Sequence, residues 1–363
     1  MLGAAAIIAT ATPASAHTVG GVNATNYATT IRSVSPANPD VTVRVIDNGD
    51  SLELTNRGRA DVVVVGYDGE PYLRVGPRGV FENVRSPAVY LNKVRRNPAP
   101  PPASADPDAP PRWQRVSTGQ TARWHDHRAH WMGAQDPPIV ARDRGEEHLV
   151  QRFRIDLRVD GATLRVRGDV RWVPGPSPWP WIIGAVVLAG ATVVGARTRR
   201  ASTVLAVVLV VALVAATVHA VGSWTYTSAG FGKRAGNSLP TVGAIALGVV
   251  ALVQLARRGL RAAAPLLVFA GLFLGIAIGL ADMSALSKSQ LPTDLAHGLD
   301  RLTIALALGG GFGVAAGAAL HVADRGSPAR GTPARMAPSG PRSPVSHDGG
   351  PDAENDSHSM MQG

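Results

Sequence analysis

Apolar and polar side chains alternate along much of the first half of the chain, which is the pattern of strands that bury one face. In residues 149–159, apolar side chains occupy alternate positions from Phe153 onward, and Arg or Asp occupies the positions between them. Residues 164–172 repeat this alternation. Both stretches are therefore predicted to be half-buried strands.

Asp160-Gly161 lies between these two stretches and is a favoured pair for a type I′ hairpin turn. A two-residue turn at this place fixes which residues face one another across the hairpin, and apolar residues then meet apolar residues. The predicted pairs are Leu157 with Leu164 and Ile155 with Val166.

Several shorter strands are predicted upstream, separated by turn formers such as Asn48-Gly49-Asp50. Many short strands at this spacing predict an antiparallel β-sandwich of immunoglobulin-like type over residues 17–175. A Pro-rich stretch at residues 97–111 cannot form strand or helix and is expected to be a long exposed loop. The upstream strands are predicted at residues 41–46, 51–55, 60–66, 72–75 and 88–91.

The second half of the chain contains five apolar runs. Each is near the roughly 20 residues that a helix needs to cross a ~30 Å hydrocarbon core. We therefore expect an all-α transmembrane bundle of five helices within residues 179–323. The runs cover residues 179–196, 203–222, 240–256, 262–281 and 302–323.

Basic loops indicate how these helices are oriented. Arg residues are concentrated at 197–200 and 257–261, in loops that five crossings would place on one side of the membrane. The positive-inside rule makes that side cytoplasmic. The β-domain is then extracytoplasmic, and the tail at residues 324–363, rich in Pro, Ser, Gly and Asp, is expected to be a disordered cytoplasmic segment. The expected location is the cell membrane, as a multi-pass protein.

The N-terminus resembles a secretory leader. Residues 1–16 combine a short apolar stretch with the ending Ala14-Ser15-Ala16, and small residues at these positions are typical of signal peptidase cleavage. The mature chain is therefore predicted to begin at His17.

Composition narrows the chemistry. The formal charge of +10 comes mostly from Arg on alternate strand positions and at helix ends, which is not the footprint of a nucleic-acid-binding protein. Cys is absent, which excludes disulfides, thiol nucleophiles and iron–sulfur clusters. A metal site would have to use His, Met, carboxylate or backbone groups.

Residues 124–132, WHDHRAHWM, form the densest cluster of such groups. If this segment begins as a strand, His125 and His127 project from one face about 7 Å apart, close enough to share a metal ion. Imidazole suits copper or zinc, and a thioether adds a preference for copper. The predicted ligands are His125, His127, His130 and Met132, joined by His17 with its free amine and imidazole.

Two other interpretations remain open. Trp124 and Trp131 could be core residues, with the three His side chains in an inert network of hydrogen bonds. Near the ends of the predicted helices, a second polar group lies at one depth, on the outer side, where it could form a shared ion or ligand site or be solvated at the membrane surface. Its members are His219, Asp282, Met283 and His297.

Three features together resemble bacterial copper-handling systems: a leader that ends before a His, a small β-sandwich outside the membrane and a helical bundle with His and Met. In those systems a CopC-type sandwich works beside a CopD-type membrane protein. Segment 124–132 also resembles one in membrane proteins of high-GC Gram-positive bacteria, and the low Lys content fits a GC-rich genome. The resemblance implies copper handling outside the membrane.

The leading hypothesis is extracytoplasmic copper binding linked to uptake or homeostasis. The alternative is a membrane-anchored structural or interaction module of the cell envelope with no metal site, and a copper-dependent redox enzyme is a third hypothesis that rests on the resemblance at His17. No metalloprotease, Ser-hydrolase or phosphate-loop motif is present, so an enzyme is not expected. Expected partners are membrane lipids and other copper-handling envelope proteins; the sequence does not fix the oligomeric state.

Overall fold

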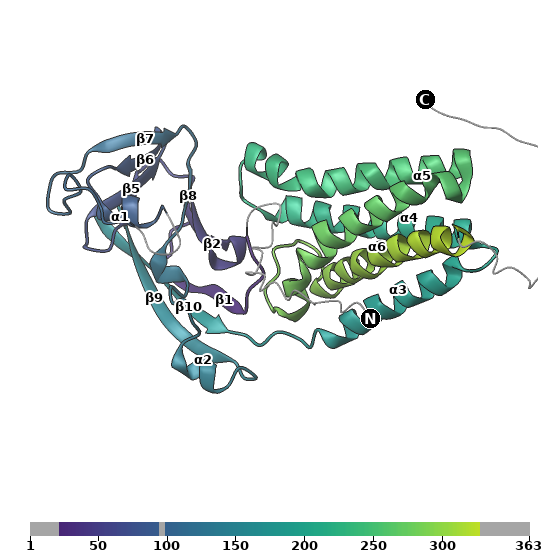
Figure 1. Ribbon diagram of the computed structural model, residues 1–363. Helices are drawn as coiled ribbons and strands as arrows, with labels where there is room; N and C mark the ends of the chain where they lie inside the picture. The colour runs from purple at the N-terminus through teal and green to yellow at the C-terminus, as the bar shows by residue number, and fades with distance from the viewer. Residues whose placement is uncertain (1–21, 94–98, 327–363) are drawn as a thin grey trace, which may run out of the picture. The chain divides into compact units, whose positions relative to one another are not determined.

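Strands occupy the first half of the chain and long helices the second half (Figure 1). The computed structural model describes residues 22–93 and 99–326. The predicted leader, His17 and the tail from residue 327 onward lie outside the described residues, and the predictions made for them remain predictions.

The described strands form two antiparallel sheets. Seven form the larger sheet, in the order β1 (Tyr27–Ser35), β10 (Ala162–Trp172), β9 (His148–Val159), β4 (Val62–Val65), β5 (Pro71–Gly76), β6 (Gly79–Asn83) and β7 (Trp113–Ser117). Three form the smaller sheet, in the order β2 (Val41–Ile46), β3 (Ser51–Asn56) and β8 (Thr121–Trp124). Antiparallel sheets followed by helices confirm the coarse fold prediction, although seven and three strands differ from the four and three of an immunoglobulin domain.

A hydrophobic core joins the two sheets. Leu52 and Leu54 of β3 are completely buried and belong to the same cluster as Val64 of β4 and Ile155 and Leu157 of β9. Burying an aliphatic side chain of this size stabilises a fold by about 1.5–3 kcal/mol. Because apolar and polar residues alternate along the strands, each sheet has one apolar face, and the two apolar faces form this core.

The predicted hairpin of β9 and β10 is confirmed in detail. Leu157 pairs with Leu164, and Ile155 pairs with Val166. Asp160 and Gly161 between the strands both have positive φ, 47° and 77°, as a type I′ turn requires.

The strand predicted at residues 88–91 is wrong, because this stretch belongs to a short helix, α1 (Pro87–Leu91). Ser86 is extended and Pro87 occupies the first turn, where the fixed φ of proline favours a helix start and its missing N–H costs nothing. Residues 99–111, within the predicted Pro-rich loop, contain neither helix nor strand.

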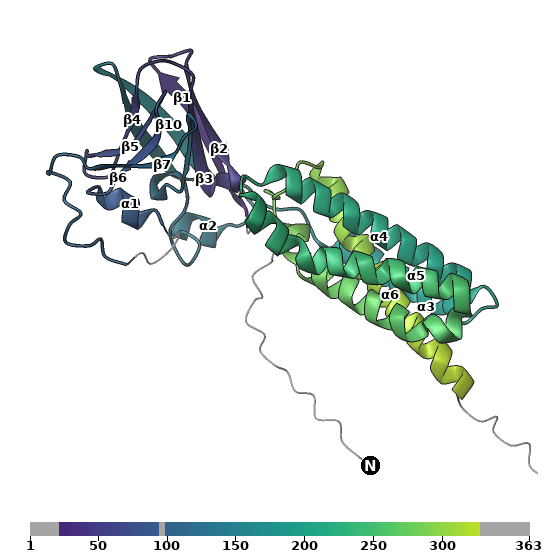
Figure 2. The same cartoon turned by 90° about the horizontal axis from the view of Figure 1, so that it is seen from above.

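Four helical elements in the part of the chain that the structure describes are long and apolar enough to span a membrane. They are α3 (Trp179–Ala196), α4 (Ala201–Tyr226), α5 (Phe231–Leu274) with its π-helical continuation η3 (Gly275–Leu280), and α6 (His297–Gly326). They lie alongside one another (Figures 1 and 2). Val186 and Val194 of α3 are 66% and 68% exposed, as expected of side chains that face lipid.

Two of the five predicted apolar runs, 240–256 and 262–281, lie within one element of 50 residues, α5 with η3. A straight α-helix of that length would be about 75 Å long, more than twice the ~30 Å of a hydrocarbon core. The element instead folds back at Gly259, which has φ 74° and ψ 174°. A Cβ added to Gly243 would lie 3.3 Å from the ring of Phe273, on the other side of Gly259.

Glycines bring α6 close to its neighbours. A Cβ on Gly309 would meet the backbone of Ala185 in α3 at 2.4 Å, and one on Gly311 would meet the backbone of Gly275 at 2.7 Å. Small residues at helix crossings allow this close approach in membrane proteins. These two glycines allow α6 to pack closely against α3 and against the start of η3.

Substituting Gly259→Ala should destabilise the reversal of α5, because its φ and ψ lie in a region that is essentially restricted to glycine, at a cost on the order of 1–3 kcal/mol. No neighbour lies within 4 Å of an added Cβ, so the loss reports backbone strain alone. We expect a lower melting temperature for the full chain in detergent. Gly236→Ala is the control, because that glycine also has open space around it within the helix; equal losses in both variants would contradict the prediction.

Candidate functional site

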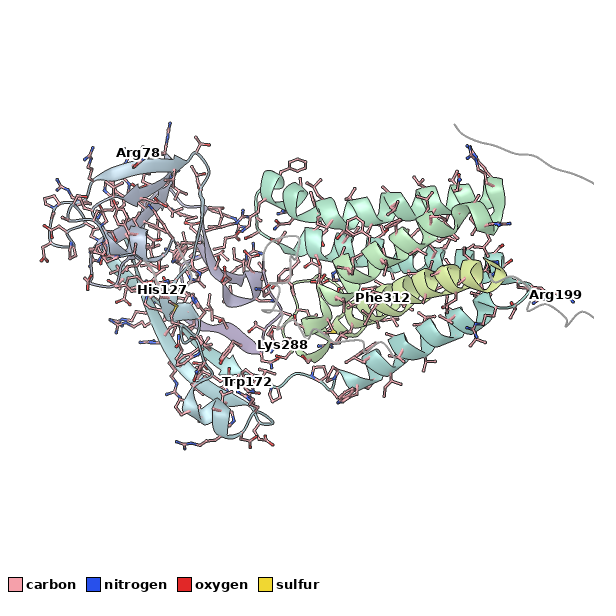
Figure 3. All side chains as sticks on the ribbon, in the orientation of Figure 1. Arg78, His127, Trp172, Arg199, Lys288 and Phe312 are labelled. Atoms are coloured by element: carbon pink, nitrogen blue, oxygen red, sulfur yellow. The ribbon has the colours of Figure 1, made fainter. Side chains whose placement is uncertain are left out.

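The candidate site begins where β8 leaves the smaller sheet. Trp124, the last residue of β8, pairs with Leu52 of β3, and a short 3-10 helix, η2 (His127–Ala129), follows. The segment is therefore a turn rather than the strand that the spacing of His125 and His127 suggested. Figure 3 labels His127 at this position.

Asp126 fixes the shape of this turn. Its side chain is completely buried and accepts hydrogen bonds from the indole of Trp124 (2.9 Å) and from Nε of Arg128 (2.9 Å). It also caps η2 by accepting a bond from the backbone N–H of Arg128 (3.1 Å). A short polar side chain at this position satisfies donors that the start of a helix leaves open.

Other strands hold the turn from outside. The amide of Gln151 in β9 donates to the carbonyls of Arg128 (2.8 Å) and His130 (3.1 Å). The hydroxyl of Thr29 in β1 donates to the carbonyl of Ala129 (2.7 Å), and Tyr67 accepts a bond from the backbone N–H of His127 (3.1 Å). The segment is thus attached to β1 and β9 of the larger sheet and to the turn that follows β4.

This turn brings the three imidazoles together. The ring centroids of His125 and His130 are 4.2 Å apart, those of His125 and His127 are 5.2 Å apart, and those of His127 and His130 are 5.8 Å apart. His130 is buried, and His125 and His127 are half-buried. Three imidazoles from one short segment therefore meet at the edge of the core.

Backbone carbonyls define the orientation of two of the rings. Nδ1 of His125 contacts the carbonyl of Asp50, and Nδ1 of His130 lies 3.1 Å from the carbonyl of Asp126. A carbonyl only accepts, so Nδ1 carries the proton in the neutral ring and Nε2 carries the lone pair. Metal-binding imidazoles in proteins are commonly fixed by such a contact at the second nitrogen.

The ring spacing fits a shared ion. Imidazoles that bind one ion through nitrogen at about 2 Å have ring centroids about 5 Å apart, and the observed separations lie around that value. Within residues 22–93 and 99–326, however, no three His, Asp or Glu side chains are already arranged as ligands of one ion. Binding of one ion by all three rings would require them to leave the orientations that the carbonyls of Asp50 and Asp126 give to His125 and His130.

The Asp126–Arg128 pair is an ion pair at the base of the site. Burial by itself raises the pKa of Asp126, but the hydrogen bonds and charge of Arg128 outweigh it and hold this pKa below its ordinary value. Burial likewise raises the pKa of the nearby Tyr67, which stays a neutral phenol. The guanidinium of Arg128 lies over the Tyr67 ring, 4.8 Å from its centroid.

Met132 and His17 are the remaining predicted ligands of this site. Met132 is half-buried two residues beyond His130, and His17 lies outside the described residues. Both stay predictions.

The second predicted group is divided by the structure. His219 of α4 lies between two carboxylates, with Nε2 3.3 Å from Asp282 and Nδ1 2.8 Å from Asp300. Met283 and His297 are exposed and belong to neither contact. Asp300 was missed because the predicted apolar run starts at residue 302, just past it.

Substituting Asp126→Asn should destabilise the full chain by about 3 kcal/mol, since it leaves the largely buried Arg128 without its carboxylate. The free energy of unfolding in denaturant measures this loss. Asp156→Asn is the matched control, because Asp156 pairs with Arg154, which is 62% exposed, and such pairs contribute less than about 1 kcal/mol. Similar losses in both variants would refute the structural role of Asp126.

The same carboxylate should make stability depend on pH. A carboxylate with a lowered folded-state pKa contributes its full stability above the ordinary value of 3.8, and loses it as the pH falls through the folded value. We expect unfolding free energy to decline below about pH 4 more steeply in the natural chain than in Asp126→Asn. Parallel pH profiles for the two proteins would count against this ion pair.

In comparisons with known proteins, no family model, no curated protein and no solved structure matches this chain. Function must therefore be inferred from the residues and their geometry.

Proposed function

We propose that this protein binds copper outside the cell membrane at His125, His127 and His130, and takes part in copper uptake or homeostasis. The observation that carries the proposal is the meeting of three imidazoles from one segment, with ring centroids 4.2–5.8 Å apart.

Copper is favoured over zinc by the composition of the segment. The chain has no Cys, so the thiolates that commonly complete structural zinc sites are absent. Met132 follows the three His residues, and a thioether favours copper, especially Cu(I). Met132 or His17 would complete the ligand set.

We propose that the β-rich part lies on the outer side of the membrane and forms a sandwich whose two sheets share one hydrophobic core. Arg199, in the turn between α3 and α4, lies at the same end of the helices as the reversal of α5 (Figures 1 and 3), and basic loops mark the cytoplasmic side. If α5 with η3 crosses twice about Gly259, the chain crosses the membrane five times. The leader 1–16 would be removed, and the tail 324–363 would be cytoplasmic.

Copper content tests the proposal directly. The full chain in detergent is stripped of metal, reconstituted with copper and freed of excess ion, and its copper-to-protein ratio is measured by elemental analysis. We expect about one copper per chain, and none when His125, His127 and His130 are all replaced by Ala. His148→Ala is the control, because His148 contacts the carbonyl of Asp143 at an exposed position of β9 and is not one of the three proposed ligands. A chain without copper, or a triple variant that keeps it, would exclude the site.

The second candidate is a structural or interaction module of the cell envelope. It is favoured by the attachment of the turn to the core through Ala129, which is 1% exposed, and through Gln151 and Thr29. In that case the triple Ala variant would keep its copper affinity and melt at a lower temperature. Copper affinity and melting temperature measured on the same preparations therefore separate the two candidates.

A further inference from the structure

His219, Asp282 and Asp300 form a second polar centre, inside the helical region. They come from three parts of the chain: α4, the turn that follows η3, and the first turn of α6. Their exposed fractions are 7%, 7% and 1%. Buried ionisable groups among membrane helices are costly unless they contact one another, and they commonly mark functional positions.

The two contacts of His219 need one more proton than a neutral imidazole and two ionised carboxylates carry together. Nδ1 faces a carboxylate oxygen of Asp300 at 2.8 Å, and Nε2 faces one of Asp282 at 3.3 Å. A neutral imidazole has one donor and one acceptor, while ionised carboxylates only accept. Both contacts are hydrogen bonds only if the ring is an imidazolium or if one carboxyl group is protonated.

We propose that His219, Asp282 and Asp300 form a proton-binding site of the helical region, which holds this additional proton and exchanges it with water. A cavity of about 10 Å³ adjoins the three side chains and is also lined by Ser223 and Ser284. That volume holds about one water molecule. A water molecule in this cavity would lie beside all three side chains and be in position to accept the proton.

The helical geometry supports a functional site. Asp282 lies two residues past the end of η3, which is π-helical, and π-helical turns occur frequently at functional sites. Among the other ionisable side chains that the structure places near the three residues, Arg301 of α6 donates to the carbonyls of Ala285 and Lys288. His297 of α6 is exposed. The proton is thus shared by His219 and the two carboxylates.

Loss of the proton would change the packing of three elements. A neutral ring would then present a lone pair to one of two ionised carboxylates, and that contact would become repulsive. Protonation therefore ties α4, η3 and α6 together, and deprotonation loosens them. This inference stands independently of copper binding and gives the helices a role beyond anchoring.

Asp282→Asn provides a sharp test. The amide can donate to Nε2, so a neutral His219 with Nδ1–H donating to Asp300 satisfies every contact without the additional proton. We expect the variant to melt close to the natural chain in detergent. Titrated potentiometrically from pH 7 towards alkaline pH, the natural chain should release about one more proton than the variant. Infrared spectra should show an imidazolium or a protonated carboxyl group only in the natural chain.

The controls make every outcome decisive. His321→Gln removes another buried His of α6, whose Nδ1 contacts the carbonyl of Ala196, and it should keep the additional proton. If Asp282→Asn fails to fold, Asp300→Asn serves by the same reasoning, with Nε2–H donating to Asp282. Equal proton release above pH 7 by the natural chain and the Asn variant would overturn the proposal. So would a natural chain that contains neutral His219 and two ionised carboxylates.

Discussion

The arrangement of the candidate site depends on a buried carboxylate, that of Asp126. A charge removed from water must be paired and hydrogen-bonded, or it is strongly destabilising. Asp126 pairs with Arg128 two residues further along the chain, and it also caps the short 3-10 helix η2 that follows β8. The indole of Trp124 and the backbone N–H of Arg128 complete the acceptor contacts of the carboxylate. That turn, rather than a strand, is what brings the imidazoles of His125, His127 and His130 together.

The same constraint operates among the helices. In a hydrocarbon environment polar groups find partners within the protein, and His219 finds them in Asp282 and Asp300. Asp300 lies in the first turn of α6, and later turns of that helix pack closely against α3 at Gly309 and against η3 at Gly311. The protein thus has two polar centres with different chemistry. One brings three imidazoles together at the edge of a β-rich core, and the other places an imidazole between two carboxylates.

The sequence was informative wherever a feature depends on local pattern. The register of β9 and β10 follows from the alternation of apolar and polar residues and from the turn at Asp160. The apolar runs were recognised because a helix needs roughly 20 apolar residues to cross a membrane. Helix α1 was missed because a proline start outweighs the strand preference of four residues. The geometry of His125 and His127 was predicted wrongly because contacts from Tyr67 and Gln151, distant in sequence, set the path of the turn. Asp300 was missed because only folding places it beside His219.

The central claim is that the three imidazoles of residues 124–132 bind one copper ion, and X-ray absorption at the copper edge tests it most directly. The full chain, loaded with one equivalent of Cu(I), should show imidazole nitrogens at about 2 Å from the metal. Replacing His125, His127 and His130 together should abolish that signal. A copper environment without imidazoles in the natural chain, or one that the triple replacement leaves unchanged, would contradict the claim.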